Sequence, residues 1–229
     1  MKKIISKYIL LYAVVSLLSS CSPMVTRQQQ YGAMYEYKPK TIVVMPPINQ
    51  TNFAEAKDYF YTTMSLPLIE KGYYVFSPYL TLEMFQTEGA YNSEMFIDGS
   101  LEQFKNVLNC DAVMFTKINK WEKKAAGGKI KVDVEYILKS SATGEILYTS
   151  SGEINLDTSI NGGGGGFGAL VSLVATAINT AAVDKVIAGR ACNQYVLQDL
   201  PEGPYSPNYL SDGKLQAWGK KVKATVKAK

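Results

Sequence analysis

The side chains best suited to covalent chemistry in this chain are three cysteines, Cys21, Cys110 and Cys192, and no histidine accompanies them. The lack of histidine excludes Ser-His-Asp catalysis, Cys-His catalysis and imidazole metal sites. The thiols then have two main uses, which are covalent modification or bridging, and burial as small apolar side chains. The position of each cysteine indicates which use applies.

Cys21 follows a segment with three distinct parts. Lys2, Lys3 and Lys7 give a positive start, residues 4–18 are mostly apolar, and Leu18-Ser19-Ser20 leads into the cysteine with small residues. This is the layout of a secretory signal. The cysteine at the cut site resembles a bacterial lipobox, in which the thiol is diacylated and the chain is cut before it. Cys21 is therefore the predicted lipidation site and membrane anchor.

Two alternatives to lipidation remain, namely simple secretion and a retained N-terminal transmembrane helix. The apolar run of about 15 residues is shorter than the roughly 20 residues that a membrane-spanning helix needs. Removing residues 1–20 from the 229-residue chain leaves 209 residues, which suits one domain of ordinary size. With 47% hydrophobic residues, this domain can bury a real core.

Cys110 and Cys192 would lie in an oxidising compartment, where disulfides persist. A Cys110–Cys192 bridge is one reading, but sequence spacing cannot show that the two residues meet. A pair of buried free thiols is the other reading. A metal site built from two cysteines without histidine is remote, so the sequence predicts neither a metal nor a cofactor.

The net charge of +4 comes from the two ends of the chain. The signal holds three lysines, and residues 214–229 hold six more lysines and no acidic residue. The part between them has 15 basic and 20 acidic residues, a balance of −5. A nucleic-acid partner is therefore not expected for the folded body.

No motif indicates an enzyme. The run Gly162–Gly166 lacks the Gly-Lys-Ser/Thr ending of a phosphate loop, and no serine lies in a Gly-x-Ser-x-Gly elbow. Carboxylates are scattered without a recognisable pair, although distant carboxylates can pair in glycoside hydrolases. They are Asp58, Glu70, Glu83, Glu88, Asp98, Glu102 and Asp111. The 16 tyrosines could stack on sugars, but strand and interface positions explain them better.

The hydrophobic periodicity and the glycine and proline breaks between segments predict an α/β (α+β) fold, with a single mixed β-sheet flanked by helices. The N-terminal half is of βαβ type, and the C-terminal half has antiparallel strands followed by a long apolar helix. Strands are predicted at 41–45, 73–77, 112–121, 129–138 and 145–156, and helices at 54–71, 81–87, 100–108 and 167–183. Pro67 predicts a kink or break in the first helix, and Ser100 is the expected N-cap of the third.

The expected organisation is a signal peptide at 1–20, a lipidated tether at 21–38, an α/β lipoprotein domain at 39–200, and a coil with a basic tail at 201–229. The tail is either a solvated end or an amphipathic basic helix on anionic lipid. The uncharged 167–183 segment is expected to pack on the sheet, with a subunit interface or membrane insertion as alternatives.

Several segments together resemble a family of bacterial outer-membrane lipoproteins of unknown function. The resemblance covers about residues 31–210 and lies in Thr41–Asn49, Pro67–Phe76, Asn109–Val113, Thr143–Leu147, the glycine run and Gly203–Pro207. The family is similar in fold to the curli secretion lipoprotein, the lipoprotein activators of penicillin-binding proteins and the N-terminal domain of TolB. This resemblance implies action by protein binding without catalysis. Cys110 departs from the small residue expected at its position.

The sequence thus predicts a lipid-anchored, periplasm-facing accessory or assembly protein of the outer membrane. It would bind an envelope protein partner through the 54–71 or the 167–183 helix. No acidic cluster follows Cys21, which favours the periplasmic side. The alternative is a self-assembling secretion-type lipoprotein that forms a ring at the outer membrane. A third hypothesis, an envelope hydrolase, is disfavoured by the missing histidines.

Overall fold

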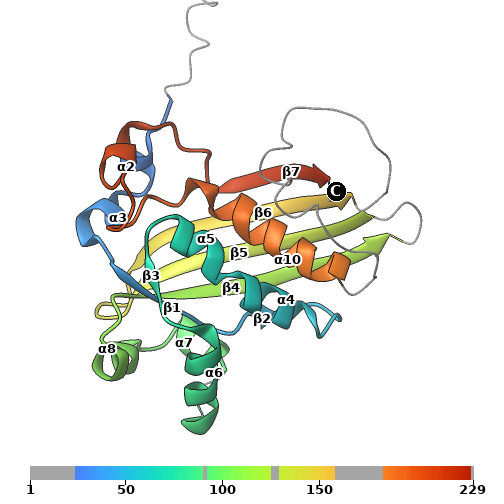
Figure 1. The fold of residues 1–229 in the computed structure, drawn as a ribbon, viewed down its shortest axis with the longest axis horizontal. Helices are drawn as coiled ribbons and strands as arrows, with labels where there is room; N and C mark the ends of the chain where they lie inside the picture. Colours follow the sequence, from blue (N-terminus) through green and yellow to red (C-terminus); the bar gives the residue numbers. More distant parts are fainter. Residues whose placement is uncertain (1–23, 90–91, 125–128, 158–182, 228–229) are drawn as a thin grey trace, which may run out of the picture.

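The computed structural model describes residues 24–89, 92–124, 129–157 and 183–227. These residues form one seven-stranded sheet of order β3-β1-β4-β5-β6-β7, with β2 pairing beside β4. The strands are β1 Thr41–Val44, β2 Ile48–Asn49, β3 Tyr74–Val75, β4 Ala112–Lys124, β5 Lys129–Ser140, β6 Ile146–Asp157 and β7 Lys221–Lys227. The helices are α2 Arg27–Gln30, α3 Gly32–Tyr37, α4 Ala56–Thr63, α5 Ser65–Glu70, α6 Pro78–Thr87, α7 Glu94–Ile97, α8 Glu102–Leu108 and α10 Val183–Val196, with the 3-10 turns η2 Leu197–Asp199 and η3 Ser211–Lys214 (Figure 1).

The sheet is mixed, as predicted. β1 runs parallel to both β3 and β4, which is the expected βαβ arrangement of the first half. β4, β5 and β6 form an antiparallel meander, as the alternation of residues 129–138 predicts. In β5, Val132 and Val134 are fully buried while Lys131 and Asp133 reach solvent. β5 therefore has one wet face over this stretch.

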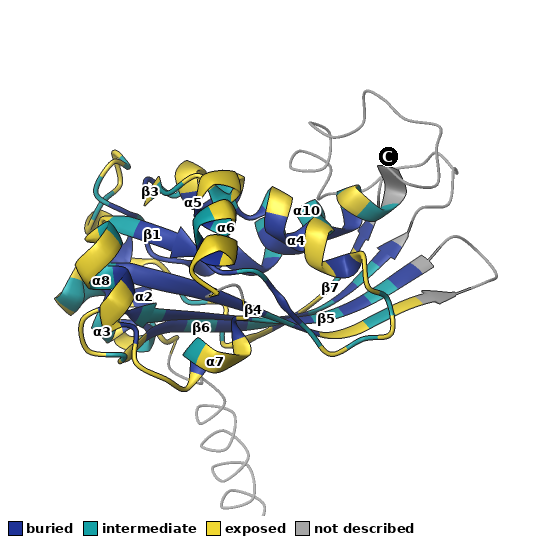
Figure 2. Cartoon of the chain, turned by 90° about the horizontal axis from the view of Figure 1, so that it is seen from below, coloured by how far each residue is buried: buried dark blue, intermediate teal, exposed yellow. Residues whose placement is uncertain are grey.

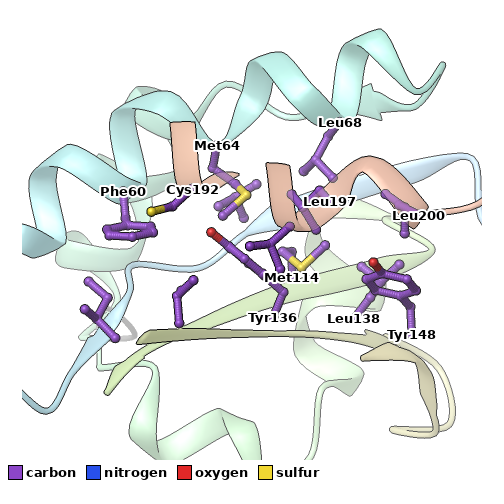
Figure 3. Packing of buried hydrophobic residues seen from close by; sticks show 14 of the residues in the cluster. Phe60, Met64, Leu68, Met114, Tyr136, Leu138, Tyr148, Cys192, Leu197 and Leu200 are labelled. Atoms are coloured by element: carbon purple, nitrogen blue, oxygen red, sulfur yellow. The ribbon is translucent and has the colours of Figure 1, made fainter. Parts of the chain in front are cut away.

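Helices cover both faces of the sheet around two hydrophobic clusters. On one face, α3, α4, α5 and α10 pack on alternate side chains of β4 and β5, such as Met114 and Tyr136. On the other face, α6, α7 and α8 pack on the intervening side chains, such as Val113 and Phe115. Figure 2 shows the strands buried between helices whose outer surfaces are exposed. Figure 3 shows the first cluster, with Phe60, Met64 and Leu68 on the helix side and Tyr136, Leu138 and Tyr148 on the sheet side.

The helix predicted at 54–71 is broken in two, as Pro67 indicates. α4 ends at Thr63 and α5 begins at Ser65, so the break lies about one turn before Pro67. In a continuous helix the proline ring would clash with the carbonyl one turn earlier, and that carbonyl would lack its N–H donor. The predicted cap of α8 is wrong by one residue. Its N-cap is Leu101, although the Ser100 hydroxyl still accepts a hydrogen bond from the Glu102 N–H at 3.3 Å.

Two segments predicted as coil are folded. Residues 22–38 were expected to form a tether, but α2 and α3 occupy most of this range, and Tyr31 and Met34 lie in the core. Residues 201–229 were expected to form a coil and a basic tail, but η3 lies there and β7 pairs with β6 in parallel. Neither the solvated end nor the amphipathic helix describes the tail.

The predicted helix at 167–183 and the run Gly162–Gly166 lie almost entirely outside the described residues. The last residue of that helix, Val183, begins α10, a 14-residue helix that the sequence analysis did not predict. α10 packs on α4 and on β5 and β6. Among the described residues, no helix is both long enough and apolar enough to span a membrane.

The hydroxyl of Tyr136 links the sheet to the helices α10 and α4 that cover it. This hydroxyl donates to Asn193 Oδ1 at 2.6 Å, while Asn193 Nδ2 donates to the Phe60 carbonyl at 3.0 Å. We expect Tyr136→Phe to lower the free energy of unfolding by about 1–3 kcal/mol, because a buried acceptor loses its donor. Urea unfolding measures this loss.

Tyr148 provides the matched control. It is as deeply buried as Tyr136, but its hydroxyl has no hydrogen-bond partner among the described residues. Tyr148→Phe should therefore be close to neutral. Equal losses for the two variants would show that the Asn193 bond contributes nothing specific.

Candidate functional site

The point where the described chain begins is fixed to the segment before β7. Thr26 pairs with Gln216 in an antiparallel bridge. The Arg27 N–H donates to the Leu215 carbonyl, and the Ala217 N–H donates to the Val25 carbonyl, each at 2.9 Å. The residues that follow the predicted lipid anchor are therefore built into the domain.

Beneath this pairing lies a buried polar cluster, which we call the Arg27 cluster and which comprises Arg27, Tyr31, Asp199 and Asp212. Arg27 Nε donates to Asp199 Oδ1 at 3.0 Å, and one terminal nitrogen donates to Asp212 Oδ2 at 3.3 Å. The Tyr31 hydroxyl donates to Asp199 Oδ2 at 2.7 Å. The partners are about 170 to 185 residues apart in sequence, so the cluster joins the two ends of the domain.

The Arg27 cluster places one guanidinium between two carboxylates. Burial alone would lower the pKa of Arg27, but the carboxylates of Asp199 and Asp212 offset this effect, so the pKa is raised and Arg27 stays protonated. Burial, followed by the neighbouring Tyr148 and Asp199, raises the pKa of Tyr31 far above its ordinary value. Neither group titrates near neutral pH, and we assign the cluster a structural role.

The backbone adds one donor to each of the two carboxylates, whereas Asp212 Oδ1 is buried without a hydrogen-bond partner among the described residues. Asp199 Oδ2 accepts from the Trp218 N–H at 2.8 Å, and Asp212 Oδ2 accepts from the Glu202 N–H at 2.9 Å. Close packing adds to these bonds, because a Cβ on Gly213 would lie 3.3 Å from Gln28 and from Tyr35. The Arg27 cluster thus fixes α2, η2, η3 and the start of β7 against one another.

A second feature is an exposed apolar surface at the other edge of the sheet, which we call the β3 surface. It gathers exposed side chains from α5, β3, the start of α6 and the loop after η2. Tyr79 is 76% exposed and Tyr74 is 53% exposed. Backbone hydrogen bonds hold these segments together, from Tyr74 N to the Lys40 carbonyl and from Tyr205 N to the Gly72 carbonyl. The members of the β3 surface are Leu66, Ile69, Tyr74, Tyr79, Leu80 and Tyr205.

Cys110 and Cys192 are both free and fully buried. They belong to the two different core clusters, on opposite faces of the sheet. The bridge considered from the sequence is therefore not formed, and the reading as buried thiols is correct for this structure. Burial raises the pKa of Cys110 to about 11 and that of Cys192 further, so both thiols stay protonated and unreactive.

The carboxylates considered for catalysis are not brought together. Six of the seven are exposed on separate helices and turns, namely Asp58, Glu70, Glu83, Glu88, Asp98 and Glu102. The seventh, Asp111, accepts from the N–H groups of Lys40 and Thr41 at 2.9 and 3.1 Å and so fixes the start of β1. No group of three or more metal-ligating side chains occurs within the described ranges.

Several tyrosines considered as a sugar-binding surface are core residues. The Tyr61 hydroxyl donates to the Pro78 carbonyl at 2.7 Å, and the Tyr73 hydroxyl donates to the Pro201 carbonyl at 2.8 Å. Burial raises the pKa of Tyr61 to about 12. These rings therefore pack the domain, and the exposed Tyr74 and Tyr79 belong to the β3 surface.

The sequence analysis missed the Arg27 cluster and β7. Arg27, Asp199 and Asp212 lie in polar segments with no local pattern, so nothing in the sequence signals their pairing. β7 did carry a signal, because Val222, Ala224 and Val226 alternate with polar residues. This is the period of a strand with one buried face, which the high lysine content obscured.

Comparisons with known proteins agree with this picture. Residues 29–204 match the family described as "Putative lipoprotein GNA1162-like". A relative from Neisseria meningitidis serogroup B (strain ATCC BAA-335 / MC58), "Putative lipoprotein NMB1124/NMB1162", is 28% identical over 203 residues, or 88% of this chain and 92% of the relative.

Two solved structures match this chain in part. The crystal structure of lipoprotein GNA1162 from Neisseria meningitidis matches with a TM-score of 0.50 and 27% identity, covering 59% of this chain and 95% of that one. The LpoB C-terminal domain from Salmonella enterica matches with a TM-score of 0.36 and 15% identity, covering 56% of this chain and 94% of that one, a likeness too distant to inform function. The resemblance inferred from the sequence is confirmed, and the chain belongs to the GNA1162-like lipoprotein family of the cell envelope.

Proposed function

We propose that this lipoprotein is anchored at Cys21 to the outer membrane, faces the periplasm, and acts as an accessory or assembly factor that binds another envelope protein. The family membership supports the lipid anchor. The observation that carries the binding role is the β3 surface, because contiguous exposed apolar area on a soluble domain marks an interaction site. Neither the Arg27 cluster nor the scattered carboxylates offer a competing catalytic centre.

The β3 surface has the properties of a protein-binding edge. β3 is the last strand on its side of the sheet, and within the described residues its outer edge has no partner strand. Such an edge offers free backbone N–H and C=O groups to an incoming strand. Ile69, Tyr74 and Tyr79 surround this edge, and aromatic residues are the side chains that protein interfaces favour. Of the 54–71 helix that the sequence suggested as an interface, α4 is packed against α10, whereas α5 contributes Leu66 and Ile69 to the β3 surface.

We expect a photoreactive phenylalanine analogue at Tyr74 to crosslink to a partner protein in living cells. Tyr74 tolerates this change because its ring is half exposed and lies edge-on to Phe76 at 5.4 Å. The matched control carries the same analogue at Val107, which is 71% exposed on α8 and is not a member of the β3 surface. Immunoblotting should show one discrete adduct from position 74 and none from position 107.

The substitution Ile69→Glu tests the same surface without a new reactive group. Ile69 is 54% exposed, so a charge there leaves the fold intact, but it should at least halve the yield of the Tyr74 adduct. The absence of an adduct from position 74, or the same adduct from position 107, would contradict the proposed surface.

A second candidate function is the self-assembling ring. The specific observation that favours it is that both ends of the described sheet, β3 and β7, are free to pair with another copy. In this case the adduct from Tyr74 would have the mass of two chains, because β3 of one copy would meet β7 of the next.

A further inference from the structure

A second exposed surface surrounds the first described residues. Met24 is 71% exposed, Val25 is 45% exposed, and Leu215 and Trp218 across from them are 55% and 46% exposed. The bridge between Thr26 and Gln216 sets the register of this pairing. Continued by two residues, that register places Met24 opposite Trp218, on the same side of the pairing.

The position of Trp218 is well fixed. Its backbone N–H donates to Asp199 in the Arg27 cluster, and its ring packs edge-on against Tyr195 with the centroids 5.9 Å apart. Because the Trp218 ring is already held in place, burying its exposed part costs little further conformational entropy. Tryptophan is also the side chain enriched at the boundary between water and lipid.

Lysines surround this apolar group. Lys214, Lys220 and Lys221 are exposed and lie on η3 and at the start of β7, beside Trp218 in sequence. Lys223 follows on β7 and reaches Glu153 only at 3.9 Å. No acidic residue occurs from position 214 to the end of the chain. Glu153 on β6 is the acidic residue that faces Lys223, so lysines outnumber acidic side chains here. Apolar side chains beside an excess of positive charge are complementary to an anionic phospholipid surface.

The length of chain before Met24 indicates what covers this surface. Cys21 lies three residues before Met24, so even a fully extended chain separates them by about 10 Å. If Cys21 carries acyl chains, as the proposed function states, Met24 and Trp218 cannot lie far from the headgroups. Figure 1 shows the same geometry, because the first described residues and the segment before β7 lie side by side along the sheet edge opposite β3.

We propose that Met24 and Trp218, with Lys214, Lys220 and Lys221, form a docking surface for anionic phospholipid headgroups of the membrane that holds the anchor. This inference rests on the proposed lipid anchor and adds an orientation to it. The domain lies with its β7 edge on the bilayer and presents the β3 surface, at the opposite edge of the sheet, to partners in the periplasm.

The test uses tryptophan fluorescence of the full acylated protein in vesicles of phosphatidylethanolamine and phosphatidylglycerol with brominated acyl chains. The chain has two tryptophans, so Trp121→Phe leaves Trp218 as the sole emitter. We expect quenching of Trp218 emission by about twofold or more relative to non-brominated vesicles. The matched variant Trp218→Phe leaves Trp121, which stacks on Phe53 at 5.3 Å on β4, and it should show no quenching.

The role of the lysines is tested by the triple variant Lys214→Gln/Lys220→Gln/Lys221→Gln and by vesicles of phosphatidylcholine alone. Each should reduce the quenching of Trp218 while the acyl chains keep the protein on the vesicle. Unchanged quenching in both would overturn the electrostatic part of the proposal.

Lysine acetylation of the unaltered chain tests the same surface without any variant that could misfold. Lys220 and Lys221 should be acetylated several-fold more slowly in anionic vesicles than in detergent, whereas Lys57, exposed on α4, should react equally in both. Mass spectrometry of the N-terminal peptide and flotation report the anchor itself. If the protein is acylated and floats with the vesicles but shows neither quenching nor lysine protection, the docking surface is overturned and the anchor stands. If the protein carries no acyl chains and does not float, the proposed anchor is overturned as well.

Discussion

A Cys21→Ala variant should leave the membrane fraction almost completely and appear in the soluble fraction. The predicted anchor is a diacylated thiol followed by a new N-terminus, and alanine has no atom to acylate. Two or more acyl chains give stable membrane association, because each buried methylene contributes roughly 0.8 kcal/mol. Without them, the lysines near Trp218 can hold the protein to anionic lipid only weakly, and salt screens that attraction.

Fractionation of cells, a wash in high salt and immunoblotting check this expectation. Ser22→Ala, one residue beyond the predicted lipidation site, is the matched control and should stay in the membrane pellet. If Cys21→Ala also stays there after the wash, the apolar run of residues 4–18 is itself the anchor, and the retained-helix alternative replaces lipidation. Labelling with a fatty-acid analogue separates these cases, because it should mark the unaltered chain and the Ser22→Ala protein but not Cys21→Ala.

The largest expected effect on stability comes from Arg27→Met. Methionine preserves the length of the aliphatic stem but leaves Asp199 and Asp212 buried without a cation. Breaking a buried ion pair by removing one partner costs about 3–5 kcal/mol, because the remaining charge is neither solvated nor compensated. The hydrogen bond from Arg27 to the Gln198 carbonyl, at 3.1 Å, is lost as well.

Lys71→Met is the matched control for Arg27→Met. Lys71 and Glu202 also join distant parts of the chain at 3.0 Å, but both side chains reach solvent, so their pair contributes about 1 kcal/mol or less. Urea unfolding of the purified proteins should separate the two variants clearly. Comparable losses would show that the Arg27 cluster is not the main connection between the ends of the domain. Adding Asp199→Asn to Arg27→Met should restore part of the stability, because one uncompensated charge is removed.

The central sheet could be predicted from the sequence because its signals are local. The run at 41–45 is apolar and β-branched, and the alternation at 129–138 has the period of a half-buried strand. Pro67 indicated the break between α4 and α5 for an equally local reason. In each case the side chains that determine the element lie within the element itself.

The two ends of the domain could not be predicted in this way, because long-range contacts determine their structure. Residues 22–38 are polar and rich in glutamine, yet α2 and α3 are held by Asp199 and Asp212, more than 160 residues away in sequence. The tether that the sequence suggested is therefore much shorter than expected, and the domain begins within a few residues of Cys21. This difference changes the proposed mechanism from a domain on a long tether to a domain that begins close to its predicted anchor.

The candidate interfaces show the same limit. The sequence pointed to the 54–71 and 167–183 helices. Of the first, α4 packs against α10 and only α5 contributes to the β3 surface, while residues 167–182 lie outside the described part of the chain. The β3 surface is assembled from α5, β3, α6 and a loop near residue 205, so no single segment has an unusual composition. Its recognition required the arrangement of these elements in space.

The most direct test of the account is the mass of the native lipoprotein, extracted in mild detergent and measured by light scattering with the detergent subtracted. A lipid-anchored accessory protein that binds a different partner should have the mass of one acylated chain, alone or with that partner. A discrete closed oligomer of many identical subunits would contradict this account. It would show instead that the β3 surface and the β7 edge are contacts between copies of the same chain.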